Sequence, residues 1–219
     1  MTRSIKLFAL LLATMVLATG CASQRTPYDY AEFKQARPAS ILVLPPLNSS
    51  PEVAATSGML SQVTYPLAES GYYVIPVALS AETFKQNGLA TAADVHHVDP
   101  AKLREIFGAD AALYVEVKAY GTSYQVISSA TVVTADAKLL DLRSSKVLWQ
   151  GTASASSAEN QQQNNNLLGM LVAAVINQIS DTLSDTSFRI AGITSNRLLM
   201  AGRANGMLYG PRSPQYQKD

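Results

Sequence analysis

The feature that most constrains the fold is a short apolar run stopped by two prolines. Ile41–Leu44 contains only branched aliphatic residues, and Pro45-Pro46 follows it directly. Such a run is typical of a strand that is buried on both faces. A helical pattern over Ser57–Ser70 then ends at Gly71, and Tyr72–Ile75 is a second short apolar run. Strand, helix and strand in this order predict a βαβ unit with parallel strands.

The second half of the chain has the pattern of an antiparallel meander. Leu113–Tyr120 alternates apolar and polar residues, and Val126–Leu142 and Val147–Ser156 form a β-hairpin pattern around a polar turn. Apolar residues three and four apart predict a long helix over Leu167–Arg189, and glycines and prolines from Ile190 onward predict no regular structure. The expected fold is mixed α+β: a βαβ unit followed by a meander, in a mixed sheet flanked by helices.

Prolines also bear on two of the predicted helices. Asp99 followed by Pro100 is a strong start signal for a helix that ends at Gly108. Pro66, in contrast, lies inside the helix of the βαβ unit, where it predicts a kink or a break.

The first twenty-one residues have the pattern of a bacterial lipoprotein signal. Two basic residues precede the apolar segment Leu7–Leu17, which is too short to cross a bilayer as a helix but long enough for a secretory signal. Gly20 and Cys21 follow, and Cys21 is the only cysteine. A single free thiol in an exported chain has no disulfide partner. We therefore predict cleavage before Cys21 and its acylation, which anchors the chain in a membrane. A plain signal peptide with an incidental cysteine is the alternative.

Four segments are predicted: a signal peptide 1–20, a tether 21–39, a single mixed α/β domain 40–190 and an extended C-terminal tail 191–219. Ala22, rather than Asp, follows the cysteine, which by resemblance to sorted bacterial lipoproteins implies the outer membrane with the domain in the periplasm. Tyr28, Tyr30 and Phe33 are apolar for a free tether, which indicates that part of it docks on the domain. The mature chain is nearly neutral, which argues against nucleic acid as a partner.

Few side chains suggest catalysis or metal binding. His96 and His97 are the only histidines, and adjacent residues face different directions, so we expect a solvated loop before the Asp99 helix. The sequence has no G-x-S-x-G elbow, no G-x-G-x-x-G motif and no P-loop. We predict no catalytic residue, no metal site and no cofactor. A hydrolase that uses His96 or His97 with a serine is the weaker alternative.

Five further residues are candidates for a site. Glu116 lies on the wet face of a strand and Asp141 in a turn, and each is interpreted as solvated. Trp149 is expected in the core, with an interface anchor as the alternative. Tyr114 and Tyr120 share the wet face with Glu116, where they either mark a binding surface or are covered by a helix or the tail.

Several segments together resemble a family of bacterial lipoproteins of unknown function. They are Ile41–Asn48, Gly71–Val77, Glu82–Leu89, Pro100–Tyr114, Gly121–Ser129, Gly192–Leu199 and Tyr209–Pro214. The family is similar in fold to the N-terminal domain of the periplasmic translocation protein TolB. Its members tend to be encoded beside a lipoprotein like the curli secretion channel subunit, which implies a role in envelope transport or assembly. The resemblance supplies no catalytic residues.

The sequence therefore predicts a membrane-tethered, non-enzymatic accessory or assembly subunit of an envelope secretion or transport complex. Its expected partners are envelope proteins, a channel-type lipoprotein among them, and further copies of itself. The alternative is a binding module for peptidoglycan or another envelope ligand, which a pocket lined by Tyr114, Tyr120 or Trp149 would favour. We also predict that Gly192–Pro214 packs in a fixed path, on its own domain or on a second copy, because it contains two of the matched segments.

Overall fold

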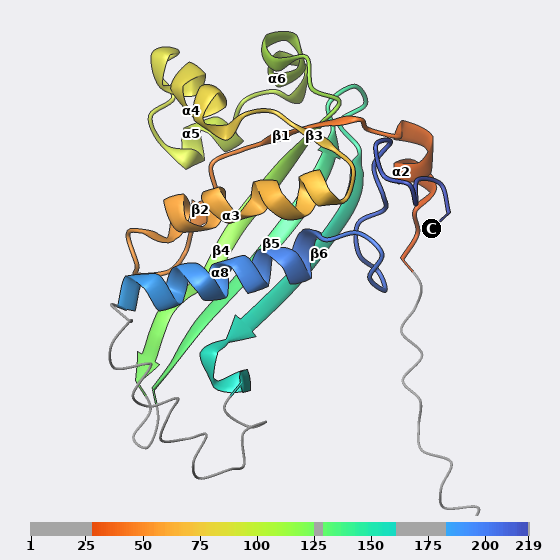
Figure 1. Cartoon of the computed structure of the whole chain (residues 1–219). Coiled ribbons are helices and arrows are strands. Elements are labelled where there is room, and N and C mark those ends of the chain that lie inside the picture. The colour runs from red at the N-terminus through yellow and green to blue at the C-terminus, as the bar shows by residue number, and fades with distance from the viewer. Residues whose placement is uncertain (1–27, 125–128, 161–182, 219) are drawn as a thin grey trace, which may run out of the picture.

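The computed structural model describes residues 28–124, 129–160 and 183–218 (Figure 1). The predicted signal peptide, Cys21 and the predicted start of the long helix lie outside these ranges. Within them the elements follow in the order α2 (Ala31–Ala36), β1 (Ser40–Val43), β2 (Leu47–Asn48), α3 (Ala55–Glu69), β3 (Tyr73–Val74), α4 (Val77–Gln86), α5 (Ala92–His96), α6 (Pro100–Phe107), β4 (Ala111–Tyr124), β5 (Ser129–Asp141), β6 (Val147–Ser156), the 3-10 turn η1 (Ser157–Asn160) and α8 (Leu183–Leu199).

The described strands form one mixed sheet of six strands in the order β3-β1-β4-β5-β6, with β2 also paired to β4. β1 pairs in parallel with β3 and β4, and β4, β5 and β6 are antiparallel neighbours. β2 continues along the same side of β4 as β1, opposite Glu116 and Val117. The two prolines therefore interrupt a strand that resumes beyond them. The predicted βαβ unit, meander and mixed sheet flanked by helices are confirmed.

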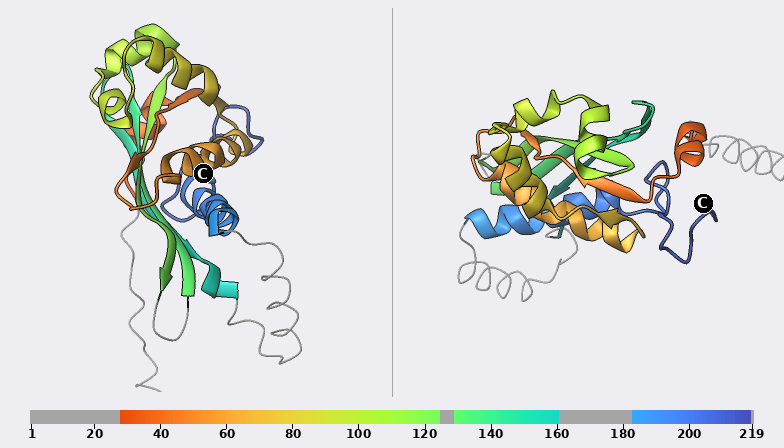
Figure 2. Two further views of the ribbon diagram at one scale, coloured as in Figure 1. Left: turned by 90° about the vertical axis from the view of Figure 1, so that its left-hand side faces the viewer. Right: turned by 90° about the horizontal axis from the view of Figure 1, so that it is seen from above.

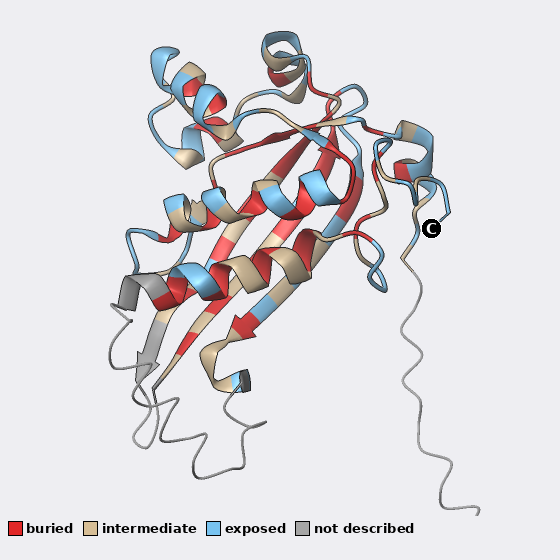
Figure 3. Ribbon diagram, viewed as in Figure 1, coloured by how far each residue is buried: buried red, intermediate tan, exposed pale blue. Residues whose placement is uncertain are grey.

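One face of the sheet is covered by α3 and α8, which lie side by side across it (Figures 1 and 2). Their inward stripes meet the sheet in a continuous buried layer (Figure 3). Met59, Leu67 and Ile190 from the helices and Leu113 and Leu139 from the sheet are each fully buried there. Burial of side chains of this size stabilises the fold by about 1.5–3 kcal/mol each.

The opposite face is covered only in part. α4, α5 and α6 pack over β1 and the start of β4, where they bury a second, smaller apolar cluster that includes Leu42, Phe84, Val95, Leu103 and Leu142. Figure 1 shows these helices at one end of the sheet. Farther along the central and edge strands, the residues on this face are polar and partly or fully exposed. This half-open face provides the surface for a site.

Pro66 does not break its helix. α3 is a single helix that includes Pro66 in its last turns, so of the kink or break expected there, the break is wrong. A proline at this position removes one backbone hydrogen bond. Pro66 is itself buried beside Leu67, and this packing offsets the loss. The helix ends after Glu69, and Gly71 follows with a φ of 94°, as expected for a glycine just beyond a helix.

The long helix extends beyond its predicted end. α8 continues to Leu199, ten residues beyond Arg189, so the expectation of irregular structure is wrong for Ile190–Leu199. From Met200 to Lys218 the chain contains no helix or strand, as predicted. Gly192 contributed to the wrong prediction, because glycine disfavours helix, yet it lies inside α8. A Cβ added there would lie 3.0 Å from the Gln62 side chain of α3, so the glycine allows the two helices to approach closely. Ser195 of α8 is also buried at this contact, and its hydroxyl donates to the Met59 sulfur of α3 at 3.5 Å.

The C-terminal segment that follows α8 packs in a fixed path on its own domain. The Gly210 amide donates to the Ser70 carbonyl at 2.8 Å, and the Arg212 amide donates to the Gly71 carbonyl at 3.0 Å. Met207 is buried in the main core. The predicted fixed path is confirmed, and of its two alternatives the structure has packing on the same chain.

Candidate functional site: a polar groove on the half-open sheet face

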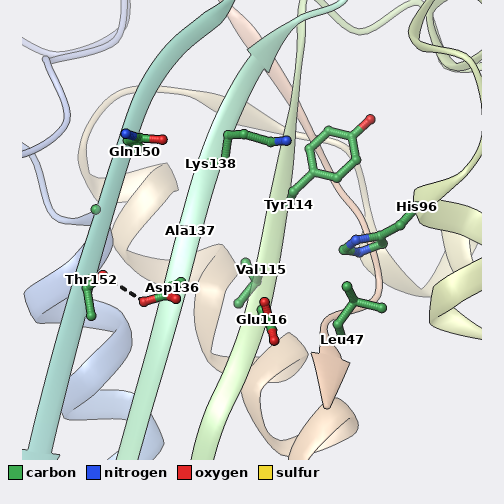
Figure 4. Close-up of a pocket in the computed structure, with 11 residues that line it drawn as sticks. Leu47, His96, Tyr114, Val115, Glu116, Asp136, Ala137, Lys138, Gln150 and Thr152 are labelled. Carbon is green, nitrogen blue, oxygen red and sulfur yellow. Dashed lines mark hydrogen bonds between the residues drawn. The ribbon is translucent and has the colours of Figure 1, made fainter. Parts of the chain in front are cut away.

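A groove of about 530 Å³ lies on the half-open sheet face, beside the layer of α4 to α6 (Figure 4). It combines both charge signs with an aromatic ring, an imidazole, an amide and a hydroxyl. Its lining residues come from β2, α5 and the three antiparallel strands, and they are Leu47, His96, Tyr114, Val115, Glu116, Asp136, Ala137, Lys138, Gln150, Gly151 and Thr152.

A β-bulge decides which predicted aromatic residue reaches this groove. The pairing of β4 with β5 shifts by one residue between Val117 and Ala119, which reverses the alternation of side chains beyond that point. Tyr114 lies before the bulge and stays on the half-open face. Tyr120 lies after it and turns to the helix-covered face, where it is buried against Gly58 of α3. The prediction that Tyr120 is on the wet face is therefore wrong.

His96 closes one end of the groove. It is the last residue of α5 and is half-buried, so the expected solvated loop is wrong for His96. Its Nε2 lies 2.9 Å from the Pro45 carbonyl oxygen, which can only accept, so Nε2 carries the proton. Burial lowers the pKa of His96, and the bond to Pro45 offsets part of this effect. The neutral imidazole meets the Tyr114 ring edge-on, with ring centroids 5.2 Å apart.

Two carboxylates stand directly opposite each other at the centre of the groove. Glu116 pairs with Asp136 across the β4–β5 ladder, an arrangement that is unfavourable unless a cation neutralises it. Lys118 supplies that cation, with its Nζ 2.7 Å from Glu116 Oε1 and 3.7 Å from Asp136 Oδ2. The hydrogen bond from Lys118, and next the one from Ser49, lower the pKa of Glu116. The Glu116 carboxylate is therefore ionised at neutral pH.

A second cation, Lys138, lies over the aromatic residue of the groove. Its Nζ is 5.1 Å from the centroid of the Tyr114 ring, within the range of a cation–π contact. Burial raises the pKa of Tyr114, so its hydroxyl remains a hydrogen-bond donor. Thr152 donates to Asp136 Oδ1 at 2.6 Å from the neighbouring strand (Figure 4). The groove thus presents separated positive and negative groups on a rigid sheet.

The other candidate residues lie elsewhere. Asp141 is buried at the end of β5, where its Oδ2 accepts hydrogen bonds from the amide and hydroxyl of Ser144, so its interpretation as solvated is wrong. The carboxylate organises the hairpin turn. Trp149 is 1% exposed, which confirms its expected place in the core. His97 is exposed, with Nδ1 2.6 Å from the Ala93 carbonyl oxygen.

The chemistry of the groove suits binding. Each imidazole has one ring nitrogen within hydrogen-bonding distance of a backbone carbonyl oxygen, whereas a hydrolase would need one of them on a serine hydroxyl. In the described ranges there is also no group of three or more side chains placed to hold a metal ion. Among the described helices, none combines the length and apolarity needed to cross a bilayer.

Sequence reasoning identified Tyr114, Glu116 and His96 but did not bring them together, and it missed the residues from the neighbouring strands. Asp136 and Lys138 alternate with buried alanines and leucine along β5. Gln150 and Thr152 alternate along β6 with buried Trp149 and with partly buried Gly151 and Ala153. The pairing of Lys138 with Gln150 and of Asp136 with Thr152 places all four on one face. The alternation was visible in the sequence, and the hairpin register was the missing step.

Comparison with known proteins first gives the class: a bacterial lipoprotein with a mixed α+β domain. The chain belongs to the family described as "Putative lipoprotein GNA1162-like", whose model matches residues 28–212. It is 48% identical over 207 residues to "Putative lipoprotein NMB1124/NMB1162" of Neisseria meningitidis serogroup B, which covers 94% of this chain and 96% of the relative. The resemblance to a family of bacterial lipoproteins is confirmed.

A solved structure supports the fold. The crystal structure of lipoprotein GNA1162 from Neisseria meningitidis is 56% identical over the aligned part and superposes with a TM-score of 0.52, covering 66% of this chain and 100% of that one. These names state the class of protein and no activity, so the groove must be interpreted from its own chemistry.

Proposed function

We propose that the chain is a non-enzymatic accessory or assembly subunit of an envelope secretion or transport complex, anchored through acylated Cys21 to the outer membrane. The observation that carries the proposal is the half-open sheet face. It joins a charged groove to a surface of exposed polar residues on three strands. A surface with separated charges of both signs selects a partner by electrostatic complementarity. The lipoprotein family and the signal pattern supply the envelope context.

Capture of partners from membranes tests this proposal. The intact lipoprotein is crosslinked in its native membrane and purified, with Cys21→Ala as a variant that cannot be acylated. We expect the wild-type chain to recover an envelope assembly protein, such as a channel-type lipoprotein, and the variant to lose it because the chain is no longer held at the membrane. Recovery of the chain alone, or equal recovery with Cys21→Ala, would overturn the proposal.

A charge reversal in the groove tests the proposed surface separately. Lys138→Glu puts a third carboxylate beside Glu116 and Asp136, and we expect the yield of crosslinked partner to fall about tenfold or more, because like charges across an interface are strongly unfavourable. The matched control is Lys102→Glu, an exposed lysine on α6. If both variants recover the partner equally well, the groove is not the docking surface.

The second candidate function is binding of peptidoglycan or another envelope ligand, and the position of Tyr114 favours it. The ring lies in the groove with a cation, two carboxylates and an amide within the same lining. This combination matches a ligand that carries both amino and carboxyl groups. Titration with soluble peptidoglycan fragments tests it, because binding that Tyr114→Ala abolishes would move the assignment from subunit to receptor.

A further inference from the structure

A second cavity, of about 260 Å³, lies at the side edge of the molecule between α2 and the C-terminal segment. Its walls are apolar and aromatic and its rim carries two cations, with no carboxylate among the lining residues. These are Phe33, Lys34, Arg37, Pro38, Tyr72, Leu208, Tyr209, Tyr216 and Gln217.

The cavity is built from fixed contacts. Phe33 is buried in the main core and holds α2 to the domain. On the opposite wall, the Tyr72 hydroxyl donates to the Leu208 carbonyl at 2.6 Å. Arg37 ends α2 with a φ of 45°, a left-handed conformation that arginine rarely adopts, and its Nε donates to the Lys34 carbonyl at 3.0 Å. The backbone that carries both cations is therefore held in one position.

The two segments that form most of this cavity carry more positive than negative charge. Across residues 28–38 and 200–218 there are five basic residues against two acidic ones. One of the acids, Glu32, is already paired, at 2.7 Å from Lys146 Nζ. This end of the domain therefore favours a ligand that is both anionic and partly apolar.

The path of the chain places this cavity close to the membrane. The Tyr28 amide donates to Asn205 Oδ1 at 3.1 Å, and the Tyr30 hydroxyl donates to the Gly206 carbonyl at 2.6 Å. Residue 28 therefore lies beside the C-terminal segment, as Figure 1 and the right-hand view of Figure 2 show. Seven peptide steps separate Cys21 from Tyr28. They span at most about 25 Å, so an acylated Cys21 keeps this end of the domain near the bilayer surface.

We propose that this cavity binds an anionic phospholipid of the membrane to which the chain is tethered. Lys34 and Arg37 bind the phosphate, and the aromatic walls receive the glycerol and the start of the acyl chains. Tyrosine favours this boundary because its ring is apolar and its hydroxyl is polar. Contact with the headgroups orients the domain, which leaves the groove on the half-open sheet face free for a partner. The inference rests on the lipid anchor of the proposed function.

Sedimentation with vesicles tests the inference. The probe is the chain without residues 1–20 and with Cys21→Ala, because acyl chains on Cys21 would bind any bilayer. Every described packing contact lies after residue 27, so this probe keeps them all. Vesicles contain phosphatidylcholine alone or with an equal part of phosphatidylglycerol. We expect binding only to the anionic vesicles, weakened roughly thirty-fold by Lys34→Gln with Arg37→Gln. Inorganic phosphate at equal concentration is expected to compete poorly, because it leaves the aromatic walls empty.

The matched control is Lys85→Gln with Lys102→Gln, which removes the same charge from exposed positions on α4 and α6. Equal weakening by both double variants would show non-specific attraction and overturn the inference, as would the absence of binding to anionic vesicles. Thermal unfolding of each variant verifies that α2 remains folded. The membrane capture described above does not depend on this cavity. A negative vesicle result with successful capture would therefore reject the lipid site and leave the proposed function in place.

Discussion

Replacing Trp149 by alanine is expected to lower the free energy of unfolding by about 3–5 kcal/mol, which is typical of removing a large aromatic side chain from a core. Trp149 is 1% exposed and belongs to the main apolar cluster. Its indole Nε1 also donates to the Asn205 carbonyl at 3.0 Å, so the same side chain joins β6 to the C-terminal segment. Its ring lies over Gly151, where an added Cβ would be 2.5 Å from Cζ2. Trp149→Ala therefore removes core packing and also the hydrogen bond that joins β6 to the C-terminal segment.

Thermal unfolding measures this effect, and a chain of this length is expected to lose roughly 2–4 °C of Tm per kcal/mol. Trp149→Phe is the informative control, because it keeps most of the apolar area but removes the Nε1 donor. We expect it to cost about 1–2 kcal/mol, chiefly from the lost hydrogen bond between Nε1 and the Asn205 carbonyl. A Trp149→Ala variant as stable as Trp149→Phe would show that the indole is not an anchor of the core.

The order of strands and helices could be predicted because each element depends on residues close together in the sequence. Asp99 caps α6, with its Oδ1 accepting from the Ala101 amide at 2.8 Å, and Gly108 ends the helix with a φ of 62°. The apolar run of β1 and the alternation of β4 are similarly local. Such signals need no knowledge of what packs against them.

The bulge in β4 and the extent of α8 could not be predicted for the opposite reason. A one-residue shift at Lys118 exchanges the two faces of the strand, and only the pairing with β5 reveals it. Gly58 and Gly192 lie inside helices. From the sequence alone, a glycine at such a position predicts a less stable helix. Each makes room for a neighbour, the Tyr120 ring in one case and the Gln62 side chain in the other. Tertiary packing thus overrides the local preference.

The groove was predictable in its parts but not as a site. Tyr114 and Glu116 were identified from one strand, yet their meeting with His96 depends on how α5 docks beside Pro45, which lies 51 residues away in the sequence. No local pattern reports a contact of that range. Function is carried by such assembled surfaces, so a fold prediction alone leaves the partner open.

Gly71→Ala is expected to release the C-terminal segment while the sheet remains folded. Gly71 has a φ of 94°, and a Cβ there would lie 2.4 Å from the Ser213 amide nitrogen and 2.9 Å from the Gly210 carbonyl oxygen. Both neighbours are backbone atoms, so the segment must move. Conformational strain and overpacking together are expected to cost about 2–4 kcal/mol.

The matched control is Gly88→Ala, since Gly88 also follows a helix with a positive φ, 79°, but nothing lies within 4 Å of its added Cβ. It is expected to lose only about 1 kcal/mol, from backbone strain alone. Trypsin cleavage at Arg212 separates the two variants, because cleavage requires the segment to open. We expect at least a tenfold faster cut in Gly71→Ala and little change in Gly88→Ala. Equal rates would mean that the close backbone contact at Gly71 does not hold the segment, which would also weaken the case for a preformed cavity beside it.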